Sequence, residues 1–348
     1  MAVAVAGCGS GDEPEAVPDG FFGVSAQGQL GDEDFTRMSE GGIEFLRIVL
    51  PWGAVDPSPA PDDFDFSTTD AVIAGAAEHG IEPVIDLIGT ASWAAEADGC
   101  AEGCGGLPAP SSGRTIDGWR EFVAAASERY GPDGTFWHDH PDLPAAPARK
   151  WQIWNEQNAT AFYAPKPDPS GYARLVESAS GAIREVDPEA TVILGGMHAQ
   201  APAKTFPATE FLRRLYEIDG IEEHFDGVAV HPYAGDPDRV GPQLDAFREV
   251  IEDAGDDASL WVTEIGWASS GGPDRLEKGP EGQAESLTDA YEQLTERHDE
   301  WDLQGVAWFS WRDQVDDPVC KWCPESGLFT EALEPKPAWD ALRSFTRG

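Results

Sequence analysis

The chain has 348 residues, of which 41% are hydrophobic and 10% aromatic, and this is enough apolar material for one large barrel or two ordinary domains. Its 64 acidic residues outnumber its 23 lysines and arginines, so the formal net charge at pH 7 is −41. A surface of this sign repels nucleic-acid backbones and anionic membranes, which excludes both as expected partners. A salt-rich habitat that screens the self-repulsion is one explanation of the charge, and a generally acidic lineage is the other.

The first twenty residues differ from the rest of the chain. Cys8 stands in Val5-Ala6-Gly7-Cys8-Gly9-Ser10, which resembles the lipobox of bacterial lipoproteins, and residues 11–19 are acidic like a flexible tether. Only seven residues precede Cys8, without a Lys or Arg, so a misassigned start or a chance match is the alternative. We expect residues 1–20 to form a lipidation segment and tether, which makes the protein exported, either at the cell surface or secreted. Membrane contact is then expected only through a lipid on Cys8.

Hydrophobic runs alternate with amphipathic segments from residue 21 to residue 348. The predicted strands are short apolar runs at Phe21–Ser25, Phe45–Leu50, Pro83–Ile88, Lys150–Asn155, Thr191–Leu194, Gly227–Val230, Leu260–Thr263 and Gly305–Phe309. The predicted helices follow them at Asp32–Ser39, Thr69–His79, Gly118–Tyr130, Tyr172–Glu185, Glu210–Tyr216, Pro242–Asp253, Glu281–Arg297 and Pro337–Phe345. Eight strand-then-helix units indicate parallel strands joined by helical crossovers. We therefore predict an α/β fold with a single (β/α)8 TIM barrel over residues 21–348, whose functional groups lie at the carboxyl ends of the strands.

Two of the predicted strands run into a glutamate at their carboxyl end. One is Trp151-Gln152-Ile153-Trp154-Asn155-Glu156, and the other is Leu260-Trp261-Val262-Thr263-Glu264. A carboxylate at the mouth of a buried strand is costly to desolvate, and such groups cluster at functional sites. These strands are the fourth and seventh of the ring, so their terminal side chains can converge across the mouth and cleave a glycosidic bond. The alternative is that each glutamate caps the helix that follows.

Trp154-Asn155-Glu156 and Thr263-Glu264 resemble the signature of the retaining glycoside hydrolases of the large clan of (β/α)8 barrels, which includes families 5 and 39. The resemblance extends from about Phe21 to the end of the chain. It implies that Glu156 is the general acid/base, that Glu264 is the nucleophile, and that Asn155 hydrogen-bonds the sugar 2-hydroxyl. The implied reaction needs no metal and no organic cofactor.

Four further residues match positions of the same clan. Arg47 matches the arginine of strand two, where a cation lowers the pKa of the nucleophile, although a structural ion pair is an equal alternative. His231 and Tyr233 match a His-x-Tyr pair after strand six; the resemblance implies that Tyr233 orients Glu264 and that His231 contacts the substrate or the acid/base. Trp308 matches the strand-eight tryptophan that forms the floor of the sugar subsite, with a core aromatic as the alternative.

The chain contains 13 tryptophans, which is more than a core of this size needs. Flat rings stack on sugar faces, so surplus tryptophan in a soluble protein is typical of a sugar cleft. We expect Trp93, Trp267 and Trp311 to line outer subsites, with packing in the core as an equal alternative.

The remaining cysteines, Cys100, Cys104, Cys320 and Cys323, can form two disulfides in three pairings or bind zinc. An exported protein favours disulfides. The loops after strands three and eight are not neighbours around the ring, so we expect the local bridges Cys100–Cys104 and Cys320–Cys323.

The sequence thus predicts a monomeric retaining β-glycoside hydrolase that acts on plant or microbial polysaccharides or oligosaccharides by double displacement. A non-catalytic carbohydrate-binding lipoprotein and a transglycosylase that uses the same site are the alternatives. The two glutamates argue against a pure binding protein, which has no need of them.

Overall fold

The computed structural model describes residues 16–26, 28–56, 64–101, 103–199, 205–314 and 320–347. Its eight parallel strands close into one barrel in chain order, which confirms the predicted (β/α)8 fold. The strands are β1 (Phe22–Ser25), β2 (Phe45–Pro51), β3 (Glu82–Ile88), β4 (Lys150–Asn155), β5 (Thr191–His198), β6 (Gly227–His231), β7 (Ser259–Ile265) and β8 (Leu303–Phe309).

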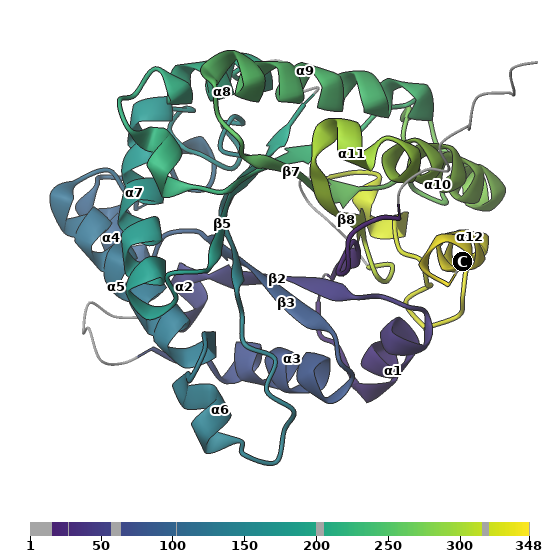
Figure 1. Cartoon of the computed structure of the whole chain (residues 1–348), viewed down its shortest axis with the longest axis horizontal. Helices are drawn as coiled ribbons and strands as arrows, with labels where there is room; N and C mark the ends of the chain where they lie inside the picture. The colour runs from purple at the N-terminus through teal and green to yellow at the C-terminus, as the bar shows by residue number, and fades with distance from the viewer. Residues whose placement is uncertain are drawn as a thin grey trace, which may run out of the picture.

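Helices surround the barrel on its outside (Figure 1). The longer ones are α1 (Asp32–Glu40), α3 (Ser67–Glu78), α5 (Gly113–Tyr130), α7 (Pro169–Val186), α8 (Ala208–Tyr216), α9 (Val240–Ala254), α10 (Gly279–Glu296) and α12 (Pro337–Thr346). Four short helices lie in the connections and were not predicted: α2 (Trp52–Val55), α4 (Ser92–Ala97), α6 (Thr135–Asp139) and α11 (His298–Trp301). With four to six residues each, they are too short to show a helical hydrophobic period. None of the helices in the described ranges is long and apolar enough to cross a membrane.

Two predicted boundaries are wrong, and the first of them matters for the site. The fifth strand continues past Leu194 to His198, through Gly195 and Gly196, which interrupt the apolar run. Glycine weakens a strand on propensity alone, but a Cβ on Gly196 would lie 2.0 Å from Nε2 of His231. The missing side chain therefore lets β6 bring His231 close to β5. The helix predicted from Gly118 begins five residues earlier, at Gly113, after the N-cap residue Ser112.

The core has two parts. The larger cluster lies between the strands and the helices, and the smaller one fills the inside of the barrel with Phe45, Val84, Ile193, Ala229, Trp261 and Ala307. Successive strand side chains point to opposite faces, so the residues two positions later point inward, one layer nearer the carboxyl ends. On four strands those residues are polar and buried: Arg47, Asp86, His231 and Thr263. The apolar layer thus closes the barrel beneath a polar layer, and the polar layer supports the mouth.

The cysteines of the described residues form the two expected local disulfides, Cys100–Cys104 and Cys320–Cys323. The first lies in the connection after α4, and the second lies in the connection after β8. Cys8 and most of the predicted tether lie outside the described residues.

Candidate active site

Arg47 on β2 links five strands of the barrel. Its guanidinium donates to Glu264 Oε1 at 2.8 Å, to Asp86 Oδ2 at 2.7 Å and to Asn155 Oδ1 at 2.8 Å. Weaker bonds join it to Ser25 Oγ at 3.2 Å and to Gln152 Oε1 at 3.3 Å. Burial lowers the pKa of Arg47, but the two carboxylates more than offset this and raise it, so the side chain stays charged.

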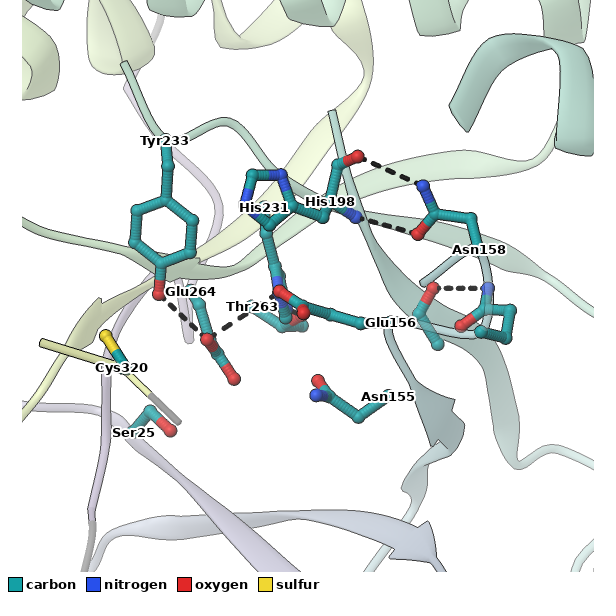
Figure 2. Close-up of polar contacts among 12 residues, drawn as sticks. Ser25, Asn155, Glu156, Asn158, His198, His231, Tyr233, Thr263, Glu264 and Cys320 are labelled. Atoms are coloured by element: carbon teal, nitrogen blue, oxygen red, sulfur yellow. Dashed lines mark hydrogen bonds and ion pairs between the residues drawn. The ribbon is translucent and has the colours of Figure 1, made fainter. Parts of the chain in front are cut away.

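Glu264 on β7 has both of its carboxylate oxygens occupied. Oε1 accepts from Arg47, and Oε2 accepts from the hydroxyl of Tyr233 at 2.8 Å (Figure 2). Burial alone would raise the pKa of Glu264, but His231, Arg47 and the Tyr233 hydroxyl together hold it below its ordinary value. The carboxylate is therefore ionised at neutral pH. Burial and the charge of Glu264 raise the pKa of Tyr233 well above its ordinary value, so Tyr233 remains a hydrogen-bond donor.

Glu156 follows β4 in an unusual backbone conformation. Trp154 and Glu156 have φ angles of 71° and 45°, in the left-handed region that non-glycine residues rarely adopt. The bend at Trp154 interrupts the alternation of inward and outward side chains along β4. In the pairing with β5, Ile153 lies opposite Leu194 and Asn155 lies opposite Gly196, but Trp154 has no partner. Trp154 packs outward on Trp119, and the bend turns the next two side chains toward the mouth. Such strain is typical of functional sites.

His231 on β6 stands between the two glutamates. Its Nδ1 lies 3.0 Å from Glu156 Oε1 and 3.6 Å from Glu264 Oε2. In the tautomer with the proton on Nδ1, the ring donates to Glu156, and Nε2 accepts from the hydroxyl of Thr263 at 3.1 Å. One carboxylate oxygen of Glu156, one of Glu264 and a ring nitrogen of His231 all lie within 4.8 Å of one another (Figure 2).

Asn155 ends β4 beside Glu156. Arg47 holds its amide oxygen, so the amide nitrogen is the atom that remains to donate to a ligand. A cavity of about 320 Å³ opens here, within the range of about 300–1,000 Å³ that is typical of small-molecule sites. Its polar lining consists chiefly of Arg47, Asp86, Asn155 and Glu264, and its apolar lining includes Ala26, Leu30, Ile88 and Phe162.

Asp86 on β3 is a site residue that the sequence reasoning missed. Its side chain is wholly buried and bonds Arg47 through Oδ2, while Oδ1 has no hydrogen-bond partner among the described residues. Burial raises the pKa of Asp86 to about 7, against the opposing pull of Arg47. Asp86 shares the Arg47 cation with Glu264, and the negative charge of Glu264 raises the pKa of Asp86 further. An acid in the middle of the apolar run Val84-Ile85-Asp86-Leu87 was the available signal.

His198 was also missed, because the predicted fifth strand stopped four residues before it. Asn158 fixes its backbone by accepting from the amide at 3.1 Å and donating to the carbonyl at 3.1 Å (Figure 2). The imidazole lies 5.8 Å from the Tyr233 ring, and its Nδ1 is buried without a partner among the described residues. Burial lowers the pKa of His198 despite the opposing charge of Glu156, so the ring is neutral at pH 7.

The structure corrects the expectation for Trp308, which does not form a floor of the mouth. Its side chain is wholly buried outside the strands, 6.1 Å from the Trp267 ring, and its indole donates to the Ser326 carbonyl at 3.1 Å. The physical reason is the alternation along β8: Ala307 points into the barrel, so Trp308 points out and Phe309 points in. The aromatic side chain of β8 near the mouth is that of Phe309, 6.4 Å from the Tyr233 ring.

The other expected subsite tryptophans divide between the core and the loops. Trp267 and Trp311 are wholly buried; Trp267 donates to the Ala234 carbonyl, and Trp311 donates to Asp34 at 2.8 Å. Neither side chain can stack on a sugar from these positions, so for both residues the alternative, packing in the core, is the correct interpretation. Trp93 on α4 is half-buried, and its indole donates to Asp56 at 3.2 Å, which leaves it a candidate for an outer subsite.

Two groups in the described ranges have ligand atoms close enough to hold a metal ion. One is Glu156 with His231 and Glu264, and the other is Asp32 with Glu78 and His79 on the surface. In the first group, the Arg47 cation already bonds Glu264, which disfavours a second cation there.

No protein-family model and no curated protein matches the chain. Several solved structures match it. A family 39 glycoside hydrolase from Bacteroides cellulosilyticus WH2 superposes with a TM-score of 0.71 at 21% identity, over 95% of this chain and 64% of that chain. A family 39 β-xylosidase from Caulobacter crescentus gives a TM-score of 0.64 at 19% identity, over 97% of this chain and 73% of that chain.

A GH5_18 protein from Streptomyces cattleya in complex with GlcNAc gives a TM-score of 0.66 at 17% identity, over 96% of this chain and 80% of that chain. The chain therefore spans less than two thirds of the family 39 protein from Bacteroides cellulosilyticus and more of the other two. At these identities the likeness concerns the fold, and this chain shares the (β/α)8 barrel of these glycoside hydrolases.

Proposed function

We propose that the protein is a retaining β-glycoside hydrolase with Glu156 as general acid/base and Glu264 as nucleophile. The observation that carries the proposal is the approach of one oxygen of each carboxylate to within 4.8 Å. Retaining enzymes hold their carboxyl groups about 5 Å apart, whereas inverting enzymes need roughly 6.5–9.5 Å to admit a water. The fold shared with family 39 and family 5 proteins is independent support.

In the first step, Glu156 transfers its proton to the glycosidic oxygen while a carboxylate oxygen of Glu264 attacks the anomeric carbon. The bond to the leaving group breaks, and a glycosyl ester of Glu264 forms. In the second step, Glu156, now a carboxylate, takes a proton from water, and the water oxygen displaces Glu264. Two inversions restore the original anomeric configuration.

The surroundings of the two carboxylates support these roles. Arg47 and Tyr233 stabilise the anionic form of Glu264, which the first step consumes and the second restores. The amide nitrogen of Asn155 is available to donate to the sugar 2-hydroxyl. Because the cavity borders Glu264 and Asn155, we assign it to the sugar whose anomeric carbon is attacked, and the leaving group to the side of Glu156.

We further propose that the substrate is a plant or microbial polysaccharide or oligosaccharide and that the protein acts as an exported monomer. The two disulfides support an oxidising compartment. Attachment through Cys8 is part of the same proposal.

Proton NMR during hydrolysis of a panel of aryl β-glycosides tests the mechanism. We expect the β-anomer of the released sugar to appear first and the α-anomer only later, by mutarotation. If the α-anomer appears first, the double displacement is wrong. If the substrates bind in calorimetry but release no product, a binding protein replaces the enzyme.

A further inference from the structure

We propose that the loop closed by the Cys320–Cys323 disulfide is a positioning device for the nucleophile. In this proposal, which rests on the proposed function, the loop holds Trp322 against Tyr233, and Tyr233 in turn holds Glu264. Trp322 is thus a positioning residue that acts through Tyr233 and has no direct role in the chemistry.

The contact between Trp322 and Tyr233 is the first observation. Their ring centres are 5.1 Å apart at an interplanar angle of 68°, in an edge-to-face arrangement. The other rings around Tyr233 are farther away: His198 at 5.8 Å, His231 at 6.1 Å and Phe309 at 6.4 Å. Trp322 also lies 6.0 Å from Phe309, so it closes an aromatic group around Tyr233. Tyr233 itself is only 5% exposed.

The anchoring of the loop is the second observation. At its start, the disulfide joins Cys320 to Cys323 around Trp322, and Cys320 lies in the close-up of the site with Tyr233 (Figure 2). At its end, the ammonium of Lys336 donates to the Glu325 carbonyl at 3.1 Å and forms a nearly buried ion pair with Asp313.

Ser326, one residue further, is wholly buried. Its carbonyl accepts from the indole of Trp308 at 3.1 Å, and its hydroxyl lies 3.1 Å from that of Ser310. The loop is therefore tied to the end of β8, which leaves Trp322 little freedom to move away from Tyr233.

The other disulfide provides a contrast within the same chain. Cys100–Cys104 also spans a short local loop, but Cys104 is exposed, and its sulfur faces the Gly99 carbonyl of the same loop. Its described contacts are local, whereas the Cys320–Cys323 loop contacts the residue that bonds Glu264. The two bridges can therefore be removed separately as a matched pair.

The expected consequence concerns the pKa of Glu264. Trp322 packs edge-to-face on the ring of Tyr233 and limits its movement, so that the Tyr233 hydroxyl stays aligned with Glu264. Loss of Trp322 exposes and loosens Tyr233, which weakens one of the bonds that hold the pKa of Glu264 low. The acidic limb of kcat/KM, which reports ionisation of the nucleophile, then moves to higher pH.

The test uses four variants of the full chain: Trp322→Ala, Trp322→Phe, the double change C320S/C323S, and its control C100S/C104S. For Trp322→Ala, we expect the acidic limb to rise by roughly half to one pH unit and kcat/KM to fall about 10-fold. Trp322→Phe keeps an aromatic ring, so its acidic limb and its kcat/KM should stay close to those of the wild type. C320S/C323S should shift the limb in the same direction, and C100S/C104S should leave it unchanged.

An acidic limb that does not move in Trp322→Ala and in C320S/C323S overturns the inference, and so does an equal shift in C100S/C104S. Circular dichroism identifies any variant that fails to fold, and if Trp322→Ala does, the comparison of C320S/C323S with C100S/C104S carries the kinetic test. Titration of ¹³C-labelled glutamate, with the Glu264 signal assigned from its loss in Glu264→Gln, measures the same pKa without turnover. If the wild-type protein hydrolyses no glycoside, the proposed function fails, while this titration still decides whether Trp322 positions Glu264.

Discussion

Glu264 and Glu156 lie at the same mouth, but the barrel holds them differently. Glu264 accepts two hydrogen bonds at 2.8 Å, one from the Arg47 cation and one from Tyr233. The carboxylate of Glu156 has a described bond only to the ring of His231, at 3.0 Å. The contrast fits the proposed roles, because a nucleophile must stay ionised and in place, whereas an acid/base must gain and lose a proton in each cycle.

Removing the more firmly held carboxylate should have the largest effect. Glu264→Gln keeps the size of the side chain but removes the attacking oxygen anion, so we expect kcat on aryl β-glycosides to fall by at least about 10⁴-fold. The control is Glu249→Gln, a change at an exposed glutamate of α9 that should leave kcat unchanged. Substantial remaining activity in Glu264→Gln would mean that another group attacks.

Removing the less firmly held carboxylate should reduce activity by less and in a way that can be rescued. Glu156→Ala removes the proton donor, so we expect kcat to fall by about 10²–10⁴-fold, least for substrates with acidic leaving groups. Azide needs no base to attack the glycosyl ester and fits the space that the side chain leaves. It should restore turnover and yield the β-glycosyl azide, identified by NMR. Formation of the α-azide instead would contradict a covalent intermediate on Glu264.

The fold and the two glutamates were within reach of the sequence because each depends on a local pattern. Apolar runs that alternate with amphipathic helices predicted all eight strands, and Glu156 and Glu264, each one polar residue after a largely apolar run, marked the carboxyl ends of β4 and β7. The networks around them were harder to predict. Arg47 contacts residues from four other strands, and these partners lie between 22 and 217 positions away in the chain.

The wrong assignment of Trp308 has a clear physical cause. In an antiparallel sheet with one wet face, polar residues show which side chains point outward. Residues 305–309 of β8 are apolar or glycine because both of its faces are buried, so the sequence does not reveal whether Trp308 or Phe309 points into the barrel. The left-handed residues Trp154 and Glu156 were unpredictable for a related reason, since tertiary packing imposes conformations that local propensity disfavours.

The bond from Tyr233 is one of the two that distinguish Glu264 from Glu156, and its removal should have an intermediate effect. A hydrogen bond to a charged group contributes about 1.5–3 kcal/mol, so Tyr233→Phe should reduce kcat/KM by roughly 10- to 100-fold. The acidic limb of its pH profile should also move up, because the Tyr233 hydroxyl helps to lower the pKa of Glu264. Tyr216→Phe is the matched control, since Tyr216 donates to Asp256 at 2.7 Å on the outside of the barrel. An unshifted limb in Tyr233→Phe would contradict this account of Glu264.

Asp86 should have the smallest effect on turnover of these residues, and its main expected effect is on stability. Its pKa is about 7 in the folded chain and about 3.9 in an unfolded one, so between these values the folded protein binds a proton that the unfolded chain has lost. Stability then falls as pH rises from 4 to 7, by up to about 4 kcal/mol from this group alone. The lowered pKa of Glu264 acts in the opposite direction, in the wild type and in Asp86→Asn.

Asp86→Asn removes the titrating group, so its free energy of unfolding relative to the wild type should increase from pH 4 to pH 7. Urea unfolding at several pH values measures this difference. The control is Asp253→Asn, a change at an exposed residue of α9, whose free energy of unfolding relative to the wild type should not change with pH. A constant difference across this range would mean that Arg47 keeps Asp86 ionised together with Glu264. In that case one guanidinium neutralises both carboxylates. Glu264 then shares the Arg47 cation equally with Asp86, and the bond from Tyr233 contributes more than Arg47 to the difference between Glu264 and Glu156.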